Sequence, residues 1–125
     1  MGEYTREELE EALKIVSSTI SNCEKAQPKF AEGTSQYTLL KNRIKALYIS
    51  KSLLTDENAD KYTNEELTDA LRPVSSIISK CEKAQLKFAK GTSFHTRFGN
   101  MIMAMHTAKS LITDEISNRN NLHHE

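Results

Sequence analysis

The chain has 125 residues, of which 27% are charged and 38% hydrophobic, and this composition is typical of one folded globular domain rather than a disordered chain. Its 17 basic and 17 acidic side chains give a formal net charge of zero, which argues against the strongly basic surface of a nucleic-acid-binding protein. No apolar run approaches the roughly 20 residues that span a bilayer, and the N-terminus lacks the apolar core of a signal peptide, so the sequence predicts a cytoplasmic protein without a transmembrane segment.

The chain repeats itself after 58 residues. The phrase CEKAQPKFAEGTS at 23–35 returns as CEKAQLKFAKGTS at 81–93, and residues 4–57 match residues 62–115 at 33 of 54 positions without a gap. Such self-similarity indicates an internal duplication. The predicted organisation is a single domain, 1–125, made of repeat unit one (4–57), a linker (58–61), repeat unit two (62–115) and a C-terminal tail (116–125).

The first helix of each unit is predicted to begin at a capping box. Thr5 is followed three residues later by Glu8, and Thr63 by Glu66, so each hydroxyl can accept from the glutamate amide while the carboxylate reaches back. Apolar residues then recur at alternating spacings of three and four, which places one stripe on one helix face. The stripes are Leu9, Leu13, Val16, Ile20, Cys23 and Phe30 in unit one, and Leu67, Leu71, Val74, Ile78, Cys81 and Phe88 in unit two.

Glycine marks the predicted end of each first helix. Gly33 and Gly91 can take the left-handed conformation that stops a helix, and the Thr-Ser pair that follows each can cap the next one. A connection this short forces the two helices of a unit to lie antiparallel. The second helices carry the stripes Leu40, Ile44, Leu47 and Leu54, and Phe98, Ile102, Met105 and Ile112. The predicted fold is all-α: an antiparallel four-helix bundle of two tandem helical hairpins with helices of roughly 22–26 residues.

The residues of this chain give little support for catalysis or metal binding. Cys23 and Cys81 form no C-x-x-C pair, so we interpret them as reduced core residues, with a disulfide or a reactive thiol as the alternative. His95 and His106 are eleven residues apart on one helix, about 16 Å along its axis, which is too far to share a metal ion. A glycine-rich phosphate loop is missing. We therefore expect no enzyme activity, no cofactor and no metal.

The second helices of the two units have diverged most. The units match at 23 of 32 positions over 4–35 but at only 10 of 22 over 36–57. Unit one has Lys41, Arg43 and Lys45 where unit two has Gly99, Met101 and Met103. Positions that hold Lys or Arg in one unit are expected to reach solvent, so the methionines can form an adaptable apolar binding surface. The alternative is that the C-terminal tail covers them. The candidate partner-binding residues are His95, Arg97, Met101, Met103 and His106.

Two overlapping segments of unit one, SNCEKAQPKFAEG (21–33) and GTSQYTLLKNRIKALYISKSL (33–53), resemble the pediocin-like (class IIa) bacteriocin immunity proteins of lactic acid bacteria and streptococci. Unit two departs from this pattern, because it reads RFGNMIMAM (97–105) where unit one has LLKNRIKAL (39–47).

The resemblance implies a small cytoplasmic four-helix bundle, peripheral at the inner membrane face, that protects the producing cell without enzyme activity. It implies as partner a membrane receptor complex of the sugar-transporter type that the bacteriocin engages, with specificity in the C-terminal half. The alternative is a structural or regulatory bundle that self-associates, for example as a homodimer, through the methionine surface.

Overall fold

The computed structural model describes residues 4–123, and the side chains of residues 4–121. The described residues form four α-helices and no strand, which confirms the expected all-α class. The helices are α1 (Arg6–Ala26), α2 (Ser35–Thr55), α3 (Asn64–Gln85) and α4 (Ser93–His123), and two short 3-10 turns, η1 (Gln27–Lys29) and η2 (Ala59–Lys61), lie between them.

Both predicted capping boxes are present. The hydroxyl of Thr5 accepts from the Glu8 amide at 3.0 Å, and a Glu8 carboxylate oxygen accepts from the Thr5 amide at 2.8 Å. Thr63 and Glu66 make the same two bonds at 3.0 Å and 2.9 Å. Helices α1 and α3 therefore begin where the sequence predicts, because the cap depends only on residues within one turn.

The first helix of each pair ends before the predicted glycine. Helix α1 stops at Ala26 and α3 at Gln85, and in each following loop a phenylalanine amide donates back across three residues at 3.1 Å, which closes a turn. Gly33 and Gly91 do adopt positive φ values of 90° and 92°, but they lie at the far end of these loops. The connections are therefore longer than Gly-Thr-Ser, and the prediction of the helix ends was wrong.

Helix α4 is longer than the predicted helices. It has 31 residues, and residues 116–123 of the expected C-terminal tail continue it. Residues 124 and 125 of that tail lie outside the described residues.

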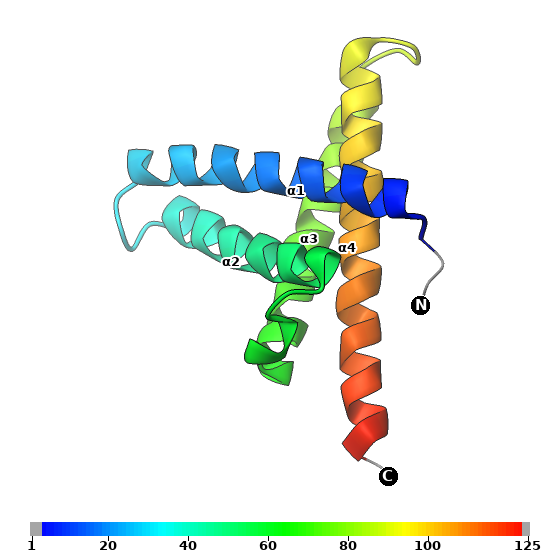
Figure 1. Ribbon diagram of the computed structural model, residues 1–125. Coiled ribbons are helices and arrows are strands. Elements are labelled where there is room, and N and C mark those ends of the chain that lie inside the picture. Colours follow the sequence, from blue (N-terminus) through cyan, green and yellow to red (C-terminus); the bar gives the residue numbers. More distant parts are fainter. Residues whose placement is uncertain (1–3, 124–125) are drawn as a thin grey trace.

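The two helical hairpins cross each other steeply. Figure 1 shows α2 returning beside α1, and α4 returning beside α3, with the first pair running across the second rather than along it. We name these pairs hairpin one (α1 and α2) and hairpin two (α3 and α4). Helix α2 packs against all three other helices, and the N-terminal half of α1 reaches across α4. The crossing therefore decides which side chains of the two hairpins meet.

The core combines residues from all four helices. Val16, Leu47, Val74 and Met105 are fully buried, and all four lie on the predicted stripes. Helix α2 also buries side chains outside its stripe, namely Ala46, Ile49 and Ser50, because more than one of its faces is covered.

Four residues of the predicted stripes lie outside the core: Leu9 and Leu13, which are half-buried, and Phe30 and Phe88. Phe30 is 39% exposed and Phe88 is 36% exposed. Each follows the point where the preceding helix ends, so the helical spacing that placed it on the stripe no longer applies.

A clamp made by Arg119 joins the end of α4 to the linker between the hairpins. Its guanidinium donates to the carbonyl oxygens of Ala59 at 3.0 Å and Tyr62 at 2.6 Å, and to Oδ1 of Asn64 at 3.2 Å. Its Nε also donates to a Glu115 carboxylate oxygen at 2.9 Å. The part of α4 that continues past unit two therefore has a structural role that the sequence did not reveal.

Cys23 and Cys81 are buried free thiols, as expected. Burial raises the pKa of both thiols, and the positive charge of Arg43 opposes this increase. We therefore expect alkylation by iodoacetamide at pH 8 to be at least about 100-fold slower in the native protein than in urea. Mass spectrometry over time measures both rates. Native labelling as fast as in urea, or a mass gain of two hydrogens on reduction, would contradict this assignment.

Candidate partner-binding site

The five candidate residues on α4 differ in their position along the helix and in their exposure to solvent. His95 and Arg97 lie near the start of α4, next to the loop that connects it to α3. Met103 is 64% exposed, and His106 is exposed beside it. Met101 is half-buried against the core, and its sulfur accepts from the Thr19 hydroxyl at 3.5 Å. The five residues therefore do not form one surface.

Helix geometry explains why the two methionines differ. Residues two apart on an α-helix point to nearly opposite sides, so Met101 and Met103 cannot share one face. Their equivalents in unit one differ in the same way, because Arg43 is half-buried whereas Lys45 is exposed. The Nε and Nη2 atoms of Arg43 are buried and have no hydrogen-bond partner among the described atoms. The side chains at 45 and 103 are exposed, as expected, whereas those at 43 and 101 reach solvent only in part.

The alternative in which the tail covers the methionines is also wrong for Met103. Residues 116–123 continue α4 away from it instead of folding back, and its side chain stays exposed.

Met103 and His106 line a groove of about 550 Å³ between the N-terminal half of α1 and the middle of α4. Its apolar floor includes Ile15 and Ala104. We call it the α1–α4 groove, and its lining residues are Tyr4, Glu7, Glu8, Glu11, Ala12, Ile15, Asn100, Met103, Ala104, His106 and Thr107.

Carboxylates form one edge of the α1–α4 groove. Glu7, Glu8 and Glu11 are all exposed side chains of α1. An apolar floor beside an acidic edge is complementary to a segment that carries both apolar and basic side chains. The flexible thioether of Met103 can adapt to the shape of such a segment.

Sequence reasoning did not connect the acidic residues of α1 with this site. Acidic residues in a first helical turn are explained sufficiently by the helix dipole, so Glu7 and Glu8 gave no separate signal. Only the crossing of the hairpins brings them beside Met103, more than 90 residues later in the chain.

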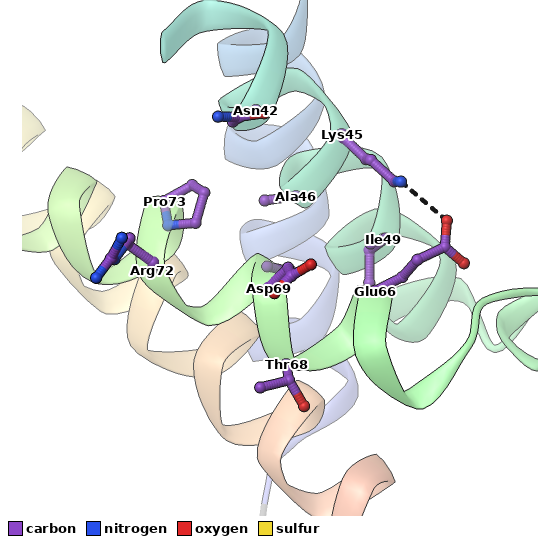
Figure 2. Close-up of a pocket in the computed structure, with 10 residues that line it drawn as sticks. Asn42, Lys45, Ala46, Ile49, Glu66, Thr68, Asp69, Arg72 and Pro73 are labelled. Carbon is purple, nitrogen blue, oxygen red and sulfur yellow. Dashed lines mark ion pairs between the residues drawn. The ribbon is translucent and has the colours of Figure 1, made fainter. Parts of the chain in front are cut away.

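A second hollow, of about 430 Å³, lies between α2 and α3, and it is more polar (Figure 2). Lys45 of α2 reaches toward Glu66 of α3, and their charged atoms are 2.9 Å apart. Bonding from the Thr63 amide and then from Lys45 lowers the pKa of the Glu66 carboxyl, and Glu66 raises the pKa of Lys45. Because these charges already satisfy each other, we interpret the pair as a link between the hairpins rather than a ligand site.

Comparisons with protein-family models, with curated proteins and with solved structures returned no match. In the part of the chain that the structure describes, no helix is both long and apolar enough to cross a membrane. Within residues 4–121, no three His, Cys, Asp or Glu side chains are grouped as metal ligands would be.

Proposed function

We propose that this protein is a non-catalytic bacteriocin immunity protein that acts by protein–protein contact through the α1–α4 groove. The observation that carries the proposal is Met103, an apolar side chain 64% exposed where unit one has Lys45. An exposed methionine that lines an apolar groove is typical of adaptable binding surfaces.

The acidic edge of the groove supports a partner with basic segments. Cytoplasmic loops of membrane proteins carry an excess of Lys and Arg. Glu7, Glu8 and Glu11 would attract such a loop, while Ile15 and Met103 would contact its apolar side chains. A membrane receptor approached from its cytoplasmic side is thus a chemically suitable partner.

The more specific parts of the proposal come from the resemblance of residues 21–53 to pediocin-like immunity proteins. These parts are the protection against a bacteriocin, the location at the inner membrane face and the sugar-transporter type of the receptor. We also propose that the hairpins derive from one duplicated antiparallel pair. The matching caps, loops and buried cysteines support that origin.

Expression in a sensitive strain, challenged with a panel of class IIa bacteriocins, tests the proposal. We expect the wild-type protein to raise the tolerated concentration of at least one bacteriocin, and Met103→Lys to reduce that tolerance at least about tenfold. The unfolding free energy of Met103→Lys should stay within about 0.5 kcal/mol of the wild type, because the side chain is exposed.

Leu39→Lys is the matched control, because Leu39 is an apolar side chain of α2, 39% exposed and outside the groove. It should leave protection unchanged. Survival against none of the bacteriocins would contradict the immunity role, and full protection by Met103→Lys would remove the groove from it. A wild-type dimer that Met103→Lys converts to a monomer would instead favour the self-associating alternative.

A further inference from the structure

The tip of hairpin two exposes apolar side chains to water. Leu86 is 86% exposed, Phe94 is 51% exposed, and Phe88 lies between them in the chain. The Phe88 ring stacks with Phe94 and with Phe98, at centroid distances of 5.0 Å and 6.0 Å. This tip projects beyond the crossing of the hairpins, away from both chain ends (Figure 1). Exposed apolar groups gathered at one projecting end indicate a contact surface.

Basic side chains surround these apolar residues. We call residues 80–97 the basic–aromatic tip: it has five basic residues against one acidic residue, Glu82, although the whole chain is neutral. All five are exposed, and within the described residues none of them pairs with a carboxylate. They are Lys80, Lys83, Lys87, Lys90 and Arg97.

The equivalent tip of hairpin one lacks this character. Residues 22–39 contain two basic and two acidic residues, and Pro28 and Gln36 stand where the other tip has Leu86 and Phe94. Both loops nevertheless share two turn bonds, one from the phenylalanine amide and one from the amide of the capping threonine, and have the same glycine conformation. The additional charges and apolar groups are therefore not needed to form the loop.

We propose that the basic–aromatic tip docks on an anionic lipid bilayer. Leu86 and Phe94 enter the boundary between headgroups and acyl chains, and the surrounding lysines face the anionic headgroups. Apolar burial and attraction of basic residues to anionic lipids act together in peripheral membrane binding, and neither is strong alone. The long aliphatic stems of the lysines allow their ammonium groups to stay at headgroup level.

The tip is less suitable for single-stranded nucleic acid. Recognition there depends on open aromatic faces on which bases stack. The Phe88 ring already stacks on two neighbouring rings, and Leu86, the most exposed apolar residue, offers no ring.

Co-sedimentation with vesicles tests the proposal without reference to bacteriocins, so it can fail or succeed independently of the immunity role. We expect binding to vesicles of phosphatidylglycerol and phosphatidylcholine, weakening as salt rises, and none to phosphatidylcholine alone. Lys87→Glu/Lys90→Glu and Leu86→Ser/Phe94→Ser should each lower the affinity at least about tenfold.

The matched control is the equivalent tip of hairpin one. Lys25→Glu/Lys29→Glu changes the net charge equally, but at the tip of hairpin one, and should leave vesicle binding nearly unchanged. A thermal melt of each variant, followed by circular dichroism, checks that the variant is folded. Three results would each overturn the proposal: no binding by the wild type, equal loss in the control pair, or retained binding in Leu86→Ser/Phe94→Ser. Tighter binding to a single-stranded RNA than to the anionic vesicles would do so as well.

Discussion

Replacing Leu47 by alanine is expected to lower the free energy of unfolding by about 3 kcal/mol. Leu47 is fully buried on α2, which packs against α1, α3 and α4, so its removal leaves a cavity that the two hairpins share. Such a cavity loses both the transfer free energy of the side chain and its packing contacts. Urea denaturation followed by circular dichroism measures the change.

Leu39→Ala is the control for this prediction, since it removes the same atoms from a side chain on the same helix that is 39% exposed. We expect a loss of less than about 1 kcal/mol there. Met105, the equivalent of Leu47 in unit two, is also fully buried, and Met105→Ala should resemble Leu47→Ala. If Leu47→Ala destabilised the protein no more than Leu39→Ala, the described core between the hairpins would be wrong.

Replacing Arg119 by methionine is expected to lower the free energy of unfolding by about 2–3 kcal/mol. The change removes the charged hydrogen bonds to Ala59, Tyr62 and Asn64, and it leaves the Glu115 carboxylate without its partner. Methionine keeps much of the apolar stem, so the loss reports mainly the polar contacts. Urea denaturation measures the stability, and amide hydrogen exchange should become faster in the linker and at the end of α4.

Arg97→Met provides the comparison, because Arg97 is an exposed arginine near the other end of α4. It should change the stability by less than about 0.5 kcal/mol and leave exchange in the linker unaltered. Equal effects of the two substitutions would show that the Arg119 clamp does not hold the linker.

The proposed partner groove, between α1 and α4, and the proposed lipid-binding tip of hairpin two lie on different parts of the protein. The groove uses the middle of α4, and the tip uses its first turns with the end of α3. Protection and vesicle binding can therefore be removed separately, the first by Met103→Lys and the second by Lys87→Glu/Lys90→Glu.

Much of the secondary structure followed from the sequence alone. The capping boxes at Thr5 and Thr63 determine where α1 and α3 begin, and the spacing around Val16 and Val74 identifies their buried faces. These features depend on residues within one or two helical turns, so local patterns were sufficient to predict them.

Only the tertiary structure decided how those helices are used. The steep crossing of the hairpins places Glu7 and Met103 in one groove, packs the half-buried Met101 against Thr19, and brings Arg119 to the linker about 60 residues earlier. The physical reason is that each of these contacts joins side chains far apart in the chain. Their meeting depends on which faces of the two hairpins pack together, and a periodic pattern shows that a face is buried but not what buries it.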